Sequence, residues 1–215
     1  MERILWLYRL PYNALRPILC YDERPCFLIG EVVAGFPIKE GQIAREHYSY
    51  EKLGSCSLLA SIEPLTGRRL ADVFDQRRKV EFARHFQSVA ENYPEAEKII
   101  VILDNLNTHN ASSFYETFEA EEAFRLSQLF EFVYTPKSAS WLNMIEIEFS
   151  AISRLCLDRR IPSKETLAKE VLAIVKEREE KEIKINWQFS IEIAREKLNR
   201  HYQQANEENA KYQKI

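Results

Sequence analysis

Residues 98–109 read Lys-Ile-Ile-Val-Ile-Leu-Asp-Asn-Leu-Asn-Thr-His, and this stretch decides the fold class of the chain. Its first half is continuously apolar and rich in β-branched residues, which favours a strand buried on both faces of a sheet. The strand is predicted to end at Asp104, where a polar segment begins. Because ligands of open α/β sheets bind at the carboxyl ends of strands, Asp104 is a candidate site residue.

A second apolar run precedes another acid. Residues 17–21, Pro-Ile-Leu-Cys-Tyr, form a short apolar run flanked by a proline, and they predict a buried strand that stops at Asp22. If this strand lies beside the first and runs parallel to it, Asp22 and Asp104 meet at one edge of the sheet. An isolated aspartate after a strand is more often a turn residue that accepts a backbone N–H, and that alternative stays open for both residues.

The remaining patterns predict the elements that surround these two strands. We expect further strands at 26–34, 57–62, 69–74 and 130–134, a long loop at 35–53, helices at 77–93, 113–125, 141–157, 164–180 and 189–203, and frayed residues at 206–215. A strand-rich beginning followed by alternating elements indicates an α/β fold with a mixed sheet of about five strands, helices on both faces and a C-terminal helical tail. The predicted division is a lead-in segment at 1–16, a catalytic domain at 17–160 and a helical extension at 161–215.

The helix expected at 141–157 offers a third acid, either Glu146 or Glu148. Both flank the apolar stripe of the helix at similar angles, so helical phase does not choose between them. A glutamate on an amphipathic helix is usually solvated surface, which is the competing interpretation. Three carboxylates at one edge would suit Mg²⁺, because this ion prefers oxygen ligands and two such ions promote phosphodiester cleavage.

Composition narrows the function classes. The formal net charge of −3 counts mildly against a nucleic-acid-binding surface, although a separate domain can supply the basic residues. The cysteines show no zinc-ligand spacing and are predicted to be small buried hydrophobes. No apolar run is long enough to cross a membrane, and no signal peptide is recognisable, so we expect no membrane partner and a cytoplasmic location.

Four motifs, taken in order, resemble those of the DDE-superfamily transposases, and most closely the bacterial insertion-sequence six-thirty family of the mariner-like superfamily. The motifs occupy 20–25, 63–67, 100–109 and 135–146, and the resemblance extends over about residues 11 to 203. It implies an RNase H-like fold and places the family's acidic triad on Asp22, Asp104 and Glu146. The pattern Leu-Asn-x-Ile-Glu is what favours Glu146 over Glu148.

The resemblance also implies an activity. A member of this family cuts and rejoins DNA during transposition with two Mg²⁺ ions, for which Mn²⁺ can substitute, held by the same three acids. It implies transposon ends and target DNA as partners, a homodimer in the active complex, and a place on the bacterial nucleoid when bound to DNA. Supporting roles fall to Asn105 and His109, which would order water or touch a phosphate, and to Asn143, which would orient Glu146. His109 capping the next helix and Asn143 bonding locally remain alternatives.

The sequence departs from the family pattern in two places. Full-length relatives carry helix-turn-helix modules before the catalytic domain, whereas only a short lead-in precedes Asp22 here. This departure puts sequence-specific end recognition by this chain in question, and it is compatible with one half of a split gene, a truncated copy or a remnant. The interval from Asp104 to Glu146 is somewhat long, with the extra residues near the acidic stretch at 116–122. Two competing functions follow: an inactive or truncated remnant that serves as an accessory or dimerising protein, and another RNase H-like nuclease. Glu23 is expected to point away from Asp22 into a structural pairing.

Overall fold

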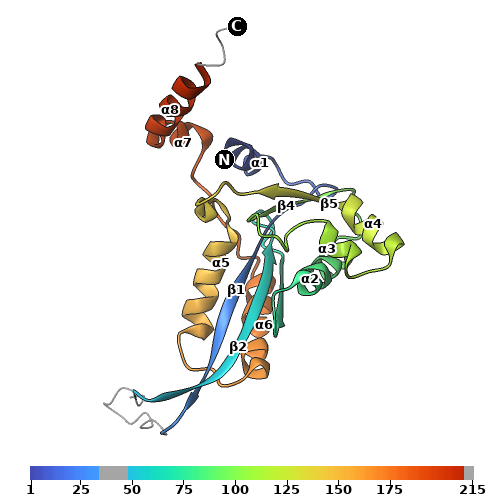
Figure 1. Ribbon diagram of the computed structural model, residues 1–215, viewed down its shortest axis with the longest axis vertical. Helices are drawn as coiled ribbons and strands as arrows, with labels where there is room; N and C mark the ends of the chain where they lie inside the picture. The colour runs from blue at the N-terminus through green and yellow to red at the C-terminus, as the bar shows by residue number, and fades with distance from the viewer. Residues whose placement is uncertain (34–47, 211–215) are drawn as a thin grey trace.

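The computed structural model describes residues 1–33 and 48–210, with the side chains described to residue 208. Five strands form one mixed sheet in the order β3-β2-β1-β4-β5 (Figure 1). Their bounds are β1 Ile18–Glu31, β2 Tyr50–Ile62, β3 Arg69–Phe74, β4 Ile99–Leu103 and β5 Phe130–Tyr134. Strand β2 is antiparallel to both β1 and β3, and β4 runs parallel to both β1 and β5. The predicted RNase H-like mixed sheet is therefore confirmed.

Helices cover both faces of this sheet, as the sequence predicted (Figure 1). Side chains alternate between the two faces of a strand, and the β1 residues divide accordingly. Leu19 and Tyr21 face an aromatic core beneath α2 (Lys79–Asn92), α3 (Ser112–Tyr115) and α4 (Ala120–Leu129). Cys20 belongs to the opposite core, which is closed by α1 (Glu2–Leu7), α5 (Ile145–Ile152) and α6 (Lys164–Glu180).

Strand β1 differs from its prediction. It does not stop at Asp22 but continues to Glu31, so the two short strands expected at 17–21 and 26–34 are largely one long strand. The polar run from Asp22 to Pro25 suggested a break, yet β2 pairs with it throughout, and Pro25 lies opposite Ser57. Of the loop expected at 35–53, residues 50–53 belong to β2, and residues 34–47 lie outside the described part of the chain.

The single helix expected at 113–125 is wrong. Two helices replace it, the one-turn α3 and the longer α4, which begins at Ala120. Ser113 was predicted to cap the helix, but its buried hydroxyl donates instead to the Thr108 carbonyl oxygen at 2.6 Å. This bond ties α3 to the loop that follows β4, and the chain turns before α4 starts.

The helix expected at 141–157 is divided into three pieces. A 3-10 turn at Ser140–Leu142 comes first, then α5, and then a π-helical segment at Ser153–Leu157. Apolar side chains of α5 still face the sheet as predicted, because Ile145, Phe149 and Ile152 are buried in the core shared with β1.

The terminal segments lie side by side. Helix α1 was not predicted, and it buries Ile4, Leu5 and Leu7. The helix expected at 189–203 is interrupted between α7 (Ile191–Lys197) and α8 (Asn199–Ala210), and the latter includes residues 206–210, which were expected to be frayed. Arg195 of α7 donates to Glu2 of α1 at 2.8 Å, which joins the two ends of the described chain.

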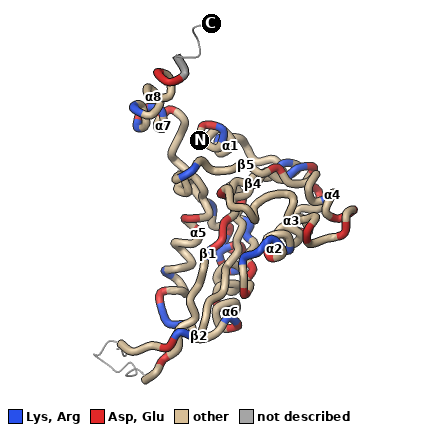
Figure 2. Tube along the Cα trace, viewed as in Figure 1, with Lys and Arg blue, Asp and Glu red and all other residues tan. Residues whose placement is uncertain are grey.

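The structure bears on two predictions made from composition, one for the cysteines and one for membrane-spanning segments. All four cysteines are free and buried, as expected of small hydrophobes. None of the helices in residues 1–33 and 48–210 is both long and apolar enough to cross a membrane. Acidic and basic residues are interspersed along the trace, with a basic stretch where α2 begins (Figure 2).

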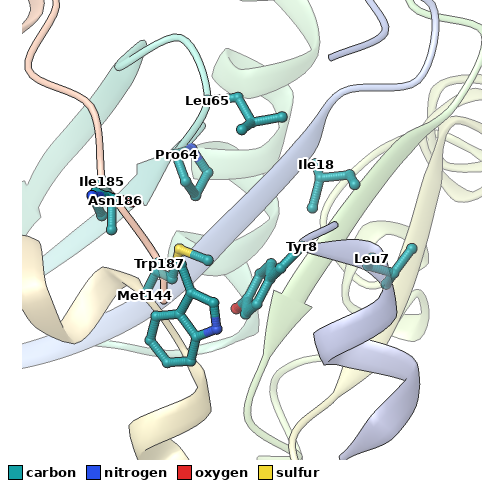
Figure 3. Close-up of a pocket in the computed structure, with 9 residues that line it drawn as sticks. All are labelled: Leu7, Tyr8, Ile18, Pro64, Leu65, Met144, Ile185, Asn186 and Trp187. Atoms are coloured by element: carbon teal, nitrogen blue, oxygen red, sulfur yellow. The ribbon is translucent and has the colours of Figure 1, made fainter. Parts of the chain in front are cut away.

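An apolar pocket lies between α1, β1 and the segment that precedes α7 (Figure 3). Its lining includes Tyr8, Ile18, Met144 and Trp187. The Tyr8 hydroxyl donates to the Leu142 carbonyl oxygen at 2.7 Å, so the pocket wall supports the turn that leads into α5. The lining contains no acidic residue, and the candidate site is found elsewhere.

Candidate active site

The register between β1 and β4 brings the two predicted aspartates together. In the parallel ladder Ile18 lies opposite Ile100 and Cys20 opposite Ile102. Two residues further along, the same register sets Asp22 level with Asp104. The parallel ladder ends before this point, because β4 stops at Leu103 while β1 continues beside β2. The edge expected from two strand ends is therefore made by one strand end and one passing strand.

Side-chain parity puts both aspartates on the same face. Cys20 and Ile102 both belong to the core beneath α5, and Asp22 and Asp104 follow them by two residues each. Successive side chains of a strand alternate, so Asp22 projects toward α5 and Glu23 toward α2. Glu23 does reach the α2 side, where it accepts a hydrogen bond from the Tyr21 hydroxyl at 3.2 Å. The expectation that Glu23 points away from Asp22 into a structural pairing is met.

Burial and nearby negative charge act together on Asp22. Burial is the main reason that the pKa of Asp22 is raised to about 7. The hydrogen bond from the backbone N–H of Glu23 acts in the opposite direction and lowers the pKa of Asp22. The charges of Asp104 and Glu146 also raise the pKa of Asp22. The Glu23 N–H donates to Asp22 Oδ1 at 2.7 Å. The three predicted acids thus lie close enough to repel one another, and a cation among them would relieve that repulsion.

The structure separates the two glutamates that helical phase left equivalent. Glu146, in the first turn of α5, is exposed. Glu148 is buried and accepts paired hydrogen bonds from Arg69 at 2.9 and 3.2 Å and from Arg178 at 2.8 and 3.0 Å. Burial alone would raise the pKa of Glu148, but the bonds from both guanidinium groups outweigh it and lower the pKa. Glu148 is therefore held in a structural ion-pair network, and Glu146 is available at the acidic edge.

His109 lies between two carboxylates. Its ring is fully buried, with Nδ1 2.5 Å from Asp104 Oδ1 and Nε2 3.1 Å from Glu23 Oε1. Burial lowers the pKa of His109, but the bond to Glu23 and the charges of Glu23 and Asp104 outweigh it and raise the pKa. The ring also stacks on Phe82 of α2 at 5.1 Å. His109 does not cap a helix, which was the alternative expected for it.

Asn143 connects the start of α5 to β1. Its buried side-chain amide donates to the Tyr21 carbonyl oxygen at 2.7 Å, one residue before Asp22. The backbone N–H of Glu146 donates to the Asn143 carbonyl oxygen at 3.2 Å. Asn143 therefore fixes the turn from which Glu146 projects, and it does so through the backbone rather than through the carboxylate.

Asn105 is exposed and lines a cleft that begins at Asp104. The opposite wall is the loop at 135–140, which contributes Thr135, Lys137 and Ser140. Lys137 is the cation of this lining, and sequence patterning gave no reason to single it out. The backbone of this loop includes Ser138 at φ 61°, the left-handed region that non-glycine residues rarely adopt. A polar cleft with one cation thus opens beside the acidic edge.

The donor chemistry of the edge suits a hard divalent cation. Three carboxylates are the oxygen ligands that Mg²⁺ prefers. Asp104 Oδ1 is buried without a hydrogen bond of normal geometry, and His109 Nδ1 lies 2.5 Å from it. Within residues 1–33 and 48–210, however, no three His, Cys, Asp or Glu side chains are drawn together closely enough to hold an ion as they stand. The residues fit the ion, and binding requires their side chains to close around it.

The sheet and its acidic edge define the class of this protein as an RNase H-like catalytic domain. The sequence profile of the DDE superfamily endonucleases matches residues 17–168, and the chain belongs to this family. The match spans all three predicted acids. A search of curated proteins gave no match.

Solved structures similar to the chain include transposase and intasome assemblies. A pre-cleavage Mos1 transpososome aligns at 14% identity and a TM-score of 0.49, over 84% of this chain and 58% of that one. A Mos1 strand transfer complex aligns at 14% and 0.46, over 83% and 57%. The simian T-cell lymphotropic virus intasome in complex with the PP2A regulatory subunit B56 gamma aligns at 13% and 0.44, over 77% and 51%. The chain spans less than two thirds of each of these proteins.

Proposed function

We propose that this chain is the catalytic domain of a DNA transposase that cuts DNA and joins the freed end to a target, with Asp22, Asp104 and Glu146 as its catalytic acids. One observation carries the proposal. The parallel register aligns Asp22 with Asp104 on the face covered by α5, and the charges of Asp104 and Glu146 both act on Asp22. Membership of the DDE endonuclease family supports the same assignment.

The reaction consists of two substitutions at phosphorus. A water oxygen bonds to the phosphorus at the element's end and the bond to the 3′ oxygen breaks, which leaves a 3′-hydroxyl. That hydroxyl then bonds to a phosphorus of the target strand and displaces its 3′ oxygen. Both steps transfer a proton from the attacking oxygen and develop negative charge on the leaving oxygen. Mg²⁺ held by Asp22, Asp104 and Glu146 would supply charge that stabilises both oxygens, and Mn²⁺ is the expected substitute.

The chain's own residues prepare the site for these steps. Asn143 sets the turn that presents Glu146 toward β1. His109 lies against Asp104 from the α2 side and restricts its carboxylate. Lys137, in the wall of the cleft that starts at Asp104, is positioned to offset the charge of a DNA phosphate, and Asn105 in the same lining can hold water or phosphate. These roles depend on side chains already oriented by the fold.

The wider assignment completes the proposal. We place the chain in the insertion-sequence six-thirty family, in a bacterial cell, acting as a homodimer on transposon ends and target DNA. The domain division is part of it: residues 17–160 perform the chemistry, preceded by a lead-in at 1–16 and followed by a helical extension at 161–215.

The test is a nicking and strand-transfer assay on duplex DNA that carries the inverted repeats flanking the gene. Wild-type chain is expected to nick the ends in Mg²⁺ or Mn²⁺ and not in EDTA. Asp104→Asn should lower the nicking rate by roughly 1000-fold. Asp158→Asn, a matched change of an exposed aspartate away from the acidic edge, should not affect it.

The same assay separates the competing functions. No nicking by wild-type chain in either ion, with DNA binding or dimerisation retained, would indicate an accessory protein. Preferential cleavage of RNA–DNA hybrids or junctions over transposon ends would indicate another RNase H-like nuclease. Nicking that survives Asp104→Asn would remove the assignment of the acids altogether.

A further inference from the structure

Glu23 is a buried acid next to Asp22 that the proposed mechanism does not use. Its side chain is 1% exposed and faces α2, away from the three catalytic acids. Its Oε1 accepts from the Tyr21 hydroxyl at 3.2 Å and lies 3.1 Å from His109 Nε2. A carboxylate is costly to bury, so one held this firmly against a histidine requires an explanation.

We propose that Glu23 is a positioning residue that fixes the Asp104 carboxylate through His109. Both nitrogens of the His109 ring face carboxylate oxygens, Nε2 at Glu23 and Nδ1 at Asp104. The bond to Glu23 sets the rotation of the ring, and the ring in turn limits where Asp104 Oδ1 can lie. This inference rests on the proposed function, because it assigns Glu23 a task toward the same metal-binding edge.

Packing around His109 makes the coupling stiff. Its ring lies 5.1 Å from Phe82 and 5.4 Å from Tyr21, centroid to centroid, and the Tyr134 hydroxyl donates to its carbonyl oxygen at 2.7 Å. A ring enclosed in this way cannot turn to follow Asp104. Asp104 must therefore adapt to His109, and the position of His109 depends on Glu23.

Two carboxylate oxygens, one of Glu23 and one of Asp104, show how His109 acts on Asp104. Glu23 Oε2 and Asp104 Oδ1 are both buried without a hydrogen bond of normal geometry. The guanidinium of Arg77 is 3.9 Å from Glu23 Oε2, and His109 Nδ1 is 2.5 Å from Asp104 Oδ1. Donors held in place around a metal-binding carboxylate orient it and tune its affinity, and their loss typically costs about 10- to 100-fold in affinity or activity. Glu23 and His109 form such a support for Asp104.

The test compares Glu23→Gln and Glu23→Ala with Glu63→Gln. Glu63 is a matched control because it is equally buried, also carries an oxygen without a donor, and bonds to Thr66 and Tyr93 instead of the site. Calorimetric titration with Mn²⁺ measures affinity directly. We expect both Glu23 variants to bind Mn²⁺ about 10- to 100-fold more weakly, and Glu63→Gln to bind it as wild type does. In nicking assays kcat should fall while KM for DNA stays unchanged.

A second measurement uses wild-type chain alone, so it does not depend on whether the variants fold. It follows the His109 ring nitrogens by nuclear magnetic resonance. Saturation with Mg²⁺ should shift the Nδ1 resonance, because that nitrogen contacts Asp104, and an unchanged resonance would overturn the inference. Wild-type Mn²⁺ affinity in folded Glu23→Ala, or an equal loss in Glu63→Gln, would overturn it too. The proposed function fails separately, if wild-type chain binds the ion without nicking DNA.

Discussion

Two buried histidines, His85 and His109, lie on either side of the Tyr21 ring, at 5.2 and 5.4 Å between centroids. Each joins two polar side chains, but the partners differ. His85 bonds at 2.7 Å to both the Ser61 hydroxyl and the Asp72 carboxylate. His109 lies between two carboxylates, those of Glu23 and Asp104.

The difference lies in how completely each network is satisfied. Among the described residues, the buried side-chain oxygens and nitrogens without a hydrogen bond are Glu23 Oε2, Glu63 Oε1 and Asp104 Oδ1. Two of these belong to the partners of His109, and none to the partners of His85. Buried polar groups are normally paired, so the carboxylates around His109 keep oxygens that can accept a further donor or a cation, whereas the buried atoms around His85 are all paired and stabilise the fold. His85 is thus a structural residue, despite a Ser-His-Asp arrangement that resembles a hydrolytic triad.

The largest expected effect on the nicking rate comes from replacing one carboxylate in each histidine network by an amide. Asp104→Asn should lower the nicking rate by roughly 1000-fold, since it removes an ion ligand worth several kcal/mol in the transition state. Asp72→Asn should leave nicking within about twofold and lower stability by about 1 kcal/mol, the contribution of one hydrogen bond. Paired nicking assays and urea unfolding measure both. The reverse pattern would contradict the distinction between the two histidines.

The same comparison applies to the two glutamates of α5, Glu146 and Glu148, of which only Glu148 is fully paired. Glu148→Gln should destabilise the fold by about 3–5 kcal/mol, because it leaves Arg69 and Arg178 with uncompensated charge in the interior. Glu146→Gln should change the free energy of unfolding by less than about 0.5 kcal/mol, as exposed substitutions usually do, while nicking is lost. Glu95→Gln, another exposed glutamate, should affect neither quantity. Chemical denaturation gives the ranking, and equal destabilisation by the two α5 variants would refute it.

Adding the ion should sharpen the difference between the incomplete and complete networks. At a concentration of 100 times its Kd, Mg²⁺ should stabilise wild-type chain by about 2.7 kcal/mol, because it binds only the folded state. Asp104→Asn should lose this gain, and Asp72→Asn should keep it. Thermal unfolding with and without EDTA provides the measurement. An equal gain in all three proteins would mean that the ion binds somewhere else.

The third buried oxygen without a hydrogen bond is Glu63 Oε1. We expect it to have the smallest effect, which is on the pH dependence of stability. Burial raises the pKa of Glu63 above its ordinary value of 4.5. As pH rises from about 4.5 through this raised pKa, the unfolded chain ionises first, so stability should fall by about 1.4 kcal/mol for each unit of pKa shift. Glu63→Gln should remove this part of the slope. Urea midpoints measured from pH 4 to 8 test it, and identical slopes for both proteins would contradict it.

Much of the sheet could be predicted because local pattern and tertiary position agree. A continuous apolar run predicted β4, a short run rich in aromatic residues predicted β5, and the turn at 64–68 predicted β3 as a hairpin partner. The continuation of β1 could not be seen, because the polar residues from Asp22 to Pro25 are held in the strand only by pairing with β2. The division into α3 and α4 was also missed, because the Ser113 hydroxyl donates to the Thr108 carbonyl oxygen instead of capping a longer helix.

The candidate site was predictable only in part. A continuous apolar run located the strand before Asp104. Resemblance to the family motifs, rather than helical phase, selected Glu146. The choice against Glu148 follows from Arg69 and Arg178, which come from β3 and α6 and have no local signature. The pairing of Glu23 with His109 spans 86 positions, so no short-range pattern could reveal it.

Asp22 lies in β1 just beyond the end of the parallel ladder with β4, where β1 remains paired with β2. The correct register of β1 is therefore needed both for a stable fold and for the proposed activity. A slip of a single position would turn Asp22 into the aromatic layer and bring Tyr21 to the face that the reacting DNA would occupy. A misaligned molecule would thus be inert as well as unstable. Insertion of one residue between Pro17 and Asp22 should be far more damaging than the same insertion in the turn between β2 and β3.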